Sequence, residues 1–204
     1  MKRGCLGSLY VGLVLLFISS SAQAISLDFV PAAQTAVIGS SVNVGMRISG
    51  LTDFAAPSLG TFDLNVNFNP AILGFSSVSY GDPVLGDQLD LLGLGSVKII
   101  TPGSGSVEVF ELSLDDATTL NTLQHGDFTL AQLTFNTLAL GTSTLNFSNV
   151  VLGDADGLPL PASLGSGSVM VTSAVVPEPS TLLLLGTALA GLLGMRWWCK
   201  KYVA

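Results

Sequence analysis

Few residues of this sequence could carry out acid–base or nucleophilic chemistry, and none has the neighbours that such chemistry needs. The single histidine of the 204-residue chain, His125, stands in a polar segment before an expected strand. A serine hydrolase of the common kind would need a Gly-x-Ser-x-Gly elbow between a strand and a helix, which the sequence lacks. We therefore interpret His125 as a solvated loop residue.

Carboxylates are present, but their spacing defines no glycosidase site, which needs two of them held across a cleft. Glu108, Glu111 and the pair Asp115-Asp116 lie in or next to one expected strand. We expect Glu108 to point to solvent, and Glu111 to do so as well if the strand frays. No phosphate-binding glycine-rich loop occurs either. The sequence predicts that the protein is not an enzyme.

One short segment has part of the pattern of a calcium loop. In Gly153-Asp154-Ala155-Asp156-Gly157 two carboxylates stand two residues apart, but the third ligand and the distal glutamate of an EF-hand are missing. The alternative, which we favour, is a Gly-Asp turn between two strands. A second acidic loop, with Asp82, Asp87 and Asp90, has no recognisable ligand spacing. The sequence thus predicts no cofactor, with Asp154 and Asp156 as calcium candidates.

The elements that must position these side chains are strands. Val42, Val44, Met46 and Ile48 alternate with polar or small residues, which is the two-residue period of a half-buried strand. The same pattern occurs at 62–68, and further strands are expected at 106–114, 130–138, 143–152 and 168–172. Gly, Pro, Asn and Asp clusters separate them, and no stretch shows a convincing helical period. This spacing predicts an all-β sandwich.

The charge of this region excludes one class of partner. Between Ile25 and Ser180 there are fourteen acidic residues and only two cations, Arg47 and Lys98, a formal charge of −12. Such a surface repels nucleic acid, so we expect no binding to DNA or RNA. The two cysteines of the chain, Cys5 and Cys199, lie outside this region, so no disulfide supports its fold.

The first 24 residues have the features of a secretory signal peptide. Met1-Lys2-Arg3 is a charged start, and an apolar run follows from Leu6 to Ile18. Ala22 and Ala24 then fit the small-x-small rule for signal-peptidase cleavage. We expect cleavage after Ala24, so that the remaining chain is exported.

The last thirty residues have the features of a membrane anchor. Pro177 and Pro179 exclude a helix at Val176-Pro177-Glu178-Pro179, because each fixes its own φ and restricts the residue before it. Residues 180–198 would form about 28 Å of helix, close to the hydrocarbon thickness of a bilayer. The cations Arg196, Lys200 and Lys201 follow as a cytoplasmic stop. We expect one transmembrane helix at about 180–198.

This order of motif, apolar run and cations resembles the PEP-CTERM sorting tail of exported bacterial proteins, a module also catalogued as the C-terminal domain of an ice-binding protein. The resemblance implies an exosortase as processing partner, with Val176, Pro177, Glu178 and Pro179 as its recognition element. An ice-binding role would need a regular Thr-x-Thr array, and Thr142-Ser143-Thr144 is one isolated instance.

A second resemblance covers most of residues 25–173. The stretch 35–70, the corner NPAIL at 69–73 and the late segment GDFTLAQLTF at 126–135 are similar in type and order to those of cohesin domains. The resemblance implies a cohesin-like jelly-roll β-sandwich related to carbohydrate-binding modules. The chain then divides into a signal peptide at 1–24, a cohesin-like sandwich at 25–174 and a PEP-CTERM tail at 175–204.

Three classes of function follow. We favour an exported, non-catalytic cell-surface or exopolysaccharide-matrix protein that starts as an inner-membrane-anchored precursor and is processed through its tail. The alternative is a binding module for polysaccharide or for a dockerin-like protein. Glycan platforms usually present Trp or Tyr, and Tyr80 is the only such residue between Ile25 and Ser180, which disfavours a glycan ligand. The least favoured class is a hydrolase.

Overall fold

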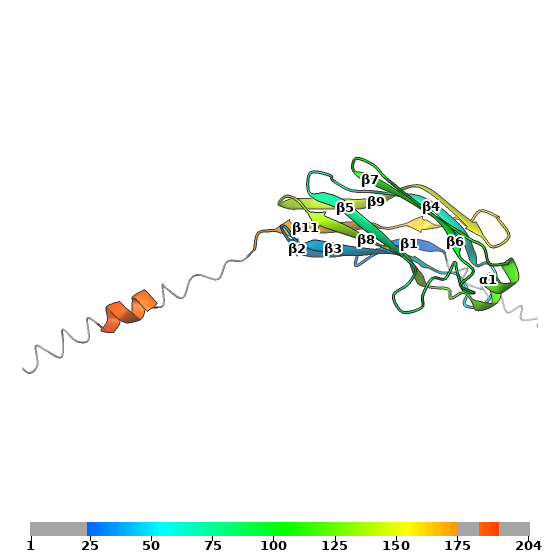
Figure 1. Cartoon of the computed structure of the whole chain (residues 1–204), viewed down its shortest axis with the longest axis horizontal. Coiled ribbons are helices and arrows are strands. Elements are labelled where there is room, and N and C mark those ends of the chain that lie inside the picture. The colour runs from blue at the N-terminus through cyan, green and yellow to red at the C-terminus, as the bar shows by residue number, and fades with distance from the viewer. Residues whose placement is uncertain (1–23, 175–183, 192–204) are drawn as a thin grey trace, which may run out of the picture.

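Two β-sheets pack face to face in the computed structural model, whose described residues are 24–174 and 184–191 (Figure 1). The first sheet has the strand order β10-β1-β3-β8-β5. Its strands are β1 (Ser26–Val30), β3 (Ser41–Ser49), β5 (Leu73–Tyr80), β8 (Phe128–Thr137) and β10 (Ser163–Leu164). The second sheet has the order β2-β11-β9-β4-β7-β6. Its strands are β2 (Ala33–Val37), β4 (Leu59–Asn67), β6 (Ser96–Pro102), β7 (Ser106–Ser113), β9 (Gly141–Asp154) and β11 (Ser166–Thr172).

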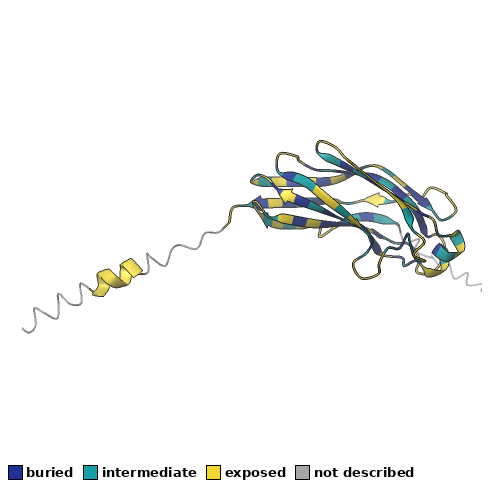
Figure 2. Cartoon of the chain, in the orientation of Figure 1, coloured by how far each residue is buried: buried dark blue, intermediate teal, exposed yellow. Residues whose placement is uncertain are grey.

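The core lies between the two sheets, where the inward side chains of every second strand position meet. In β4 the apolar residues Phe62, Leu64 and Val66 are fully buried, while the polar residues between them are half-exposed. Figure 2 shows the same division, with buried residues on the inner faces and exposed residues on turns and outer faces. The alternation read from the sequence therefore marks the buried face, and the all-β two-sheet prediction is confirmed.

The six strands expected from alternation are all present as β3, β4, β7, β8, β9 and β11. The prediction missed the strands β1, β2, β5, β6 and β10, and also the short helix α1 (Ala117–Leu123). Helix α1 begins after Asp116, whose side chain accepts a hydrogen bond of 2.8 Å from the Thr119 N–H. Because α1 is only seven residues long, it is too short to show a helical period.

At both ends of the domain the chain passes from the first sheet to the second, from β1 to β2 and from β10 to β11. The chain leaves β1 at Pro31, which has no N–H to continue the ladder, and enters the second sheet as β2. Near the end it leaves β10 at Gly165, where a side chain would collide with Asp28. It then continues in the second sheet as β11. These segments pair in parallel, β1 with β10 and β2 with β11, so the end of the domain is held by its beginning in both sheets.

Candidate functional site

Most of the residues that the sequence singles out for sorting lie outside the described residues. These are the cleavage-site residue Ala22, the motif Val176 to Pro179, and the cations Arg196, Lys200 and Lys201; Ala24, the other cleavage-site residue, is the first described residue and is exposed. Within the expected transmembrane segment, residues 184–191 are helical and exposed. Among the described residues, no helix has the length and apolar character needed to cross a bilayer.

The calcium candidates form a turn. The Asp154 side-chain oxygen Oδ1 accepts hydrogen bonds from the Asp156 and Leu158 N–H groups, at 3.0 and 2.7 Å. This carboxylate therefore closes the connection after β9, as expected for an Asx turn. Nowhere in 24–174 and 184–191 do three or more His, Cys, Asp or Glu side chains come together as metal ligands. The turn accounts for both residues, and calcium binding stays a prediction.

The acidic loop after β5 is held together by its own carboxylates. Asp82 accepts hydrogen bonds from the Val84, Leu85 and Thr129 N–H groups. Burial raises the pKa of Asp82, but these hydrogen bonds outweigh it and hold the pKa below its usual value. Asp87 likewise accepts from the Leu89 N–H, and Asp90 accepts from the Gly95 N–H. The acids that lacked ligand spacing thus fold the loop.

His125 belongs to a loop, as expected, but it also contacts protein groups. Its side chain is about a third exposed and lies edge-on to Phe54, with ring centroids 4.8 Å apart. Its Nδ1 atom is 3.6 Å from the Asp53 carboxylate. The neighbouring Gln124 is buried and bonds to backbone groups of Leu59 in β4 and of Gln88 in the acidic loop. His125 therefore has a packing role at this end of the sandwich.

The prediction that Glu111 points to solvent is wrong. In β7 the inward positions are Val107, Val109, Glu111 and Ser113, so Glu111 enters the interior, and it has no exposed surface. Glu108 lies on the outer face and is half-buried. The reason is the two-residue period, which places residue 111 on the same face as 107 and 109.

Glu111 is only partly paired inside the sandwich. Its Oε1 atom accepts a hydrogen bond of 2.6 Å from the Ser96 hydroxyl and lies 3.2 Å from the Lys98 amine. Its Oε2 atom is buried with no hydrogen-bond partner. Burial is the main reason that the pKa of Glu111 rises to about 7, and the nearby Asp87 charge adds to it against the opposing effects of Ser96 and Lys98.

Lys98 links Glu111 to the acidic loop and to β5. Its amine donates a hydrogen bond of 2.6 Å to Asp87 and lies 5.4 Å from the centre of the Tyr80 ring. The Tyr80 hydroxyl donates to the carbonyl oxygens of Ile99 and Phe110 across the gap between the sheets. This group of polar side chains therefore joins the open edges of the two sheets. Because its contacts are all internal, we interpret it as structural.

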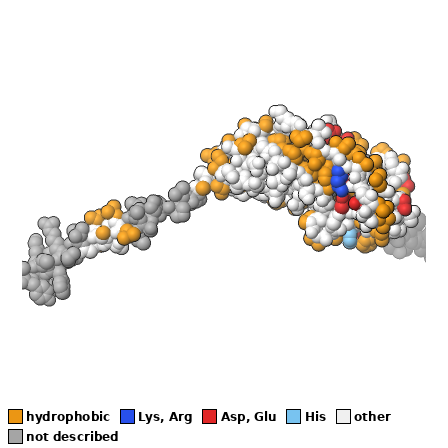
Figure 3. Space-filling model, viewed as in Figure 1, with side chains coloured by type: hydrophobic (Ala, Val, Ile, Leu, Met, Phe, Trp, Pro, Cys, Tyr) orange, Lys and Arg blue, Asp and Glu red, His pale blue; other side chains and the backbone are white. Residues whose placement is uncertain are grey.

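The outer face of the second sheet exposes a row of apolar side chains. Cross-strand pairing places Val97 beside Leu112 and Ile99 beside Phe110, and the row continues through Asp63 to Val151. Val97, Ile99, Leu112 and Val151 are between 40% and 62% exposed. Figure 3 shows hydrophobic side chains on the side of the domain where Figure 1 labels β6 and β7. We call this surface, on β6, β7, β4 and β9, the apolar sheet face.

The opposite outer face, on the first sheet, is polar. There Thr134 donates to Asn43 and Ser41 donates to Asn136, which are side-chain hydrogen bonds across neighbouring strands. Within the apolar sheet face, burial and then the charge of Glu108 raise the pKa of Asp63. The two outer faces therefore differ in chemistry: the second sheet exposes aliphatic side chains and the first exposes polar ones.

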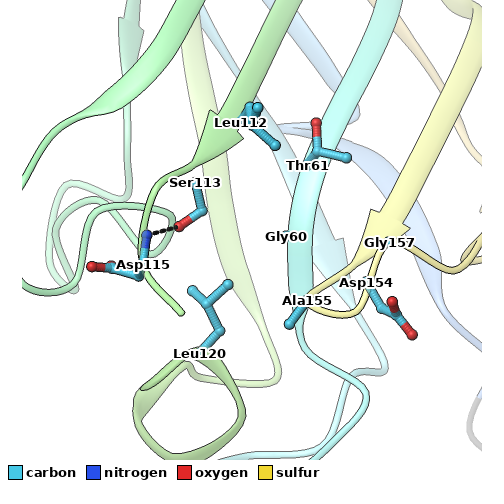
Figure 4. A pocket seen from close by; sticks show the side chains of 9 residues that line it. All are labelled: Gly60, Thr61, Leu112, Ser113, Asp115, Leu120, Asp154, Ala155 and Gly157. Atoms are coloured by element: carbon cyan, nitrogen blue, oxygen red, sulfur yellow. Dashed lines mark hydrogen bonds between the residues drawn. The ribbon is translucent and has the colours of Figure 1, made fainter. Parts of the chain in front are cut away.

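A small cavity of about 140 Å³ lies where β4 and β7 meet α1 (Figure 4). Thr61, Leu112 and Leu120 line it, and the carboxylates of Asp115 and Asp154 stand at its sides and point away from it. Asp115 instead accepts a hydrogen bond of 2.7 Å from the Leu91 N–H. The cavity thus has no pair of carboxylates directed at a common point, as hydrolysis of a glycoside would need.

Comparison with known proteins assigns the tail. Residues 175–197 match the PEP-CTERM protein-sorting motif. No curated protein matches the chain in sequence.

Solved structures similar to the domain are cohesins. The non-cellulosomal cohesin of the hyperthermophilic archaeon Archaeoglobus fulgidus is 18% identical with a TM-score of 0.55, and the match covers 74% of this chain and 94% of that one. The sixth cohesin of Acetivibrio cellulolyticus scaffoldin B, solved in complex with the Cel5 dockerin, is 21% identical with a TM-score of 0.56 over 73% of this chain and 99% of that one. The Coh-OlpA–Doc918 complex of Clostridium thermocellum gives 12% identity and a TM-score of 0.58, over 73% and 99%. At these identities the likeness establishes the fold, so the chain carries a cohesin-like β-sandwich followed by a PEP-CTERM sorting motif.

Proposed function

We propose that this protein is an exported, non-catalytic component of the cell surface or exopolysaccharide matrix, processed by an exosortase through its tail. The match of residues 175–197 to the sorting motif carries this proposal. The described domain supports it, because its acids fold loops and close turns and do not converge on a cavity. The signal peptide, the transmembrane helix near 180–198 and removal of the tail are parts of the same proposal.

Replacing Pro177, Glu178 and Pro179 by alanine should abolish processing of the tail. The altered chain should accumulate at the inner membrane at precursor size, because the extended recognition element is gone while the apolar run remains. Mass spectrometry of the fractionated protein would measure this. The matched control is replacement of Pro159 and Pro161, which have the same spacing inside the domain. Normal size and surface location of the tail variant would refute the sorting role.

We propose as a second function that the domain binds a protein partner of dockerin type through the apolar sheet face. Two of the similar structures are cohesins in complex with dockerins. A polysaccharide is less favoured, because the hydroxyl of Tyr80 is bonded to backbone carbonyls and its ring faces Lys98. The exposed aliphatic side chains of β6 and β7 offer the non-polar contact that a protein partner uses.

A charge placed in the apolar sheet face should weaken that binding. A photo-crosslinking side chain at Phe110, introduced in the native cells, would identify the partner, and titration with the purified partner would then follow. Ile99→Asp should lower the affinity at least about tenfold, because a buried unpaired charge is costly at an interface. Thr134→Asp on the polar face is the control and should change little. Equal loss in both variants, or crosslinking to no protein, would refute this function.

A further inference from the structure

Four turns and the end of the last strand form one end of the sandwich. They are the turns at 37–40, 69–72, 102–105 and 138–140, together with Thr172, and we call this the tail-proximal end. The Ile38 N–H donates to the Thr172 carbonyl oxygen at 2.9 Å, and the Leu138 N–H donates to the Ile72 carbonyl oxygen at 2.8 Å. The Phe68 N–H donates to the Gly105 carbonyl oxygen at 2.9 Å, which joins the turn at 102–105 to the strand before the turn at 69–72. These contacts place the start of the tail beside the turn at 37–40, at this end of the sandwich.

The tail-proximal end has no charged residue. The stretches 29–46, 64–81, 99–107, 128–153 and 157–174 contain no Asp, Glu, Lys, Arg or His. Nine of the acids instead occupy loops at the opposite end, which we call the acidic end: Asp53, Asp82, Asp87, Asp90, Asp115, Asp116, Asp127, Asp154 and Asp156. In Figure 3 the part of the domain nearest the tail shows hydrophobic and neutral atoms, and charges appear only farther away. The charge of this acidic domain is thus segregated along its long axis.

The tail-proximal end also exposes aliphatic side chains. Val37 and Ile38 are each 41% exposed, Leu138 is 54% exposed and Leu140 is 57% exposed. They lie at neighbouring turns, because the Gly39 N–H donates to the carbonyl oxygen of Thr137. An uncharged surface with protruding aliphatic side chains is suited to the interface of a bilayer, whose interior rejects charge.

The chain length between this surface and the apolar run is short. Seven residues, 173–179, lie between the end of β11 and the transmembrane helix expected at about 180–198. Fully extended they span at most about 25 Å, so the domain stays near the bilayer while the helix is inserted. A negatively charged leaflet would then repel the acidic end and leave the uncharged end facing it.

We propose that the tail-proximal end docks on the lipid surface of the membrane while the tail holds the precursor there. This rests on the membrane anchoring in the proposed function. Four aliphatic side chains are too few to hold the free domain, so docking depends on the high effective concentration that the tail provides. Removal of the tail therefore also releases the tail-proximal end from the membrane. Docking would hold the sorting motif close to the bilayer while the precursor awaits processing.

A reporter at each end of the sandwich tests this in the full precursor. A fluorophore is attached to Leu138→Cys, or to Leu94→Cys at the acidic end, in a chain that also carries Cys5→Ser and Cys199→Ser, and the protein is reconstituted in phosphatidylcholine–phosphatidylglycerol vesicles. Leu94 is 69% exposed, so both sites are accessible to labelling. A nitroxide on the lipid headgroup should quench the label at 138 several-fold more than the label at 94. Adding Ile38→Asp and Leu140→Asp should remove that difference without releasing the protein from the vesicles.

The outcomes separate the two proposals. Equal quenching at both sites, in protein that floats with the vesicles, overturns docking but leaves the proposal of membrane anchoring by the tail standing. Failure of the precursor to float overturns the membrane role of the tail, and docking with it. Because the vesicles contain no other protein, quenching at 138 cannot come from contact with a protease. If the label at 138 is shielded only in cells and never quenched in vesicles, a protein partner covers this end and docking on lipid is refuted.

Discussion

Glu111→Gln should flatten the dependence of domain stability on pH between about 4.5 and 7. Burial raises the pKa of Glu111 from 4.5 to about 7 in the folded domain, so over this range the unfolded chain ionises before the folded one does. The stability that Glu111 contributes is complete below the unfolded pKa and is lost as the pH rises through the folded pKa. Glutamine keeps the shape without ionising. As the pH rises from about 4.5 to 7, the free energy of unfolding of the variant should therefore increase by about 3 kcal/mol relative to that of the natural chain.

Chemical unfolding at a series of pH values would measure this difference. Glu108→Gln is the matched control, because Glu108 lies three residues earlier in the same strand but on its outer face. Its profile should follow that of the natural chain. If Glu111→Gln and Glu108→Gln give the same profile, Glu111 is not the buried titrating group.

Gln124→Leu should destabilise the domain by about 3 kcal/mol at any pH. The buried Gln124 amide donates to the carbonyl oxygens of Leu59 and Gln88, both at 2.9 Å, and its oxygen accepts from the Leu59 N–H at 2.6 Å. Leucine has a similar size but leaves these three backbone groups without partners in the interior, and each unsatisfied group costs about 1–3 kcal/mol. The segment after α1 would lose its connection to β4 and to the acidic loop.

Denaturant unfolding would measure this loss, with Leu123→Ala as control. Leu123 is adjacent in the chain but about half exposed, so its removal should change stability by less than about 0.5 kcal/mol. Equal effects from the two variants would show that Gln124 does not organise this end of the sandwich.

A strand can be recognised from the sequence when one of its faces is apolar and the other is polar, because its residues then alternate. β3 and β4 have that pattern because they lie inside their sheets, with one face on the core and the other in water. β6 is an edge strand whose residues are almost all exposed, so Val97-Lys98-Ile99-Ile100 shows no alternation. β2 is an edge strand with a similar lack of pattern. Edge strands therefore escaped the prediction for a physical reason.

The error on Glu111 had a usable signal. Val107 and Val109 have the same parity as Glu111, so a regular strand places the carboxylate inside. The expected exposure depended on fraying of the strand, but β7 continues to Ser113. The partners that make burial tolerable, Ser96 and Lys98, come from the neighbouring strand β6. No spacing along the chain reveals them, because they meet only through pairing of β6 with β7.

The apolar sheet face could not be predicted for a related reason. Ile99, Phe110 and Val151 are far apart in the sequence and become neighbours only through the strand order of the second sheet. The sorting motif, by contrast, is a continuous run of residues, so its order in the sequence was enough to identify it.

The parallel pairing of β11 with β2 has a mechanical consequence. The strand that leads into the tail lies between β2 and β9 and is hydrogen-bonded to both along its length. A pull on an anchored tail acts along β11, so both ladders must slide at once before the strand is extracted. Such loading in shear resists force far better than peeling bonds apart one after another. Under the anchoring proposed above, β11 carries the load on the domain, and both of its ladders resist that load in shear.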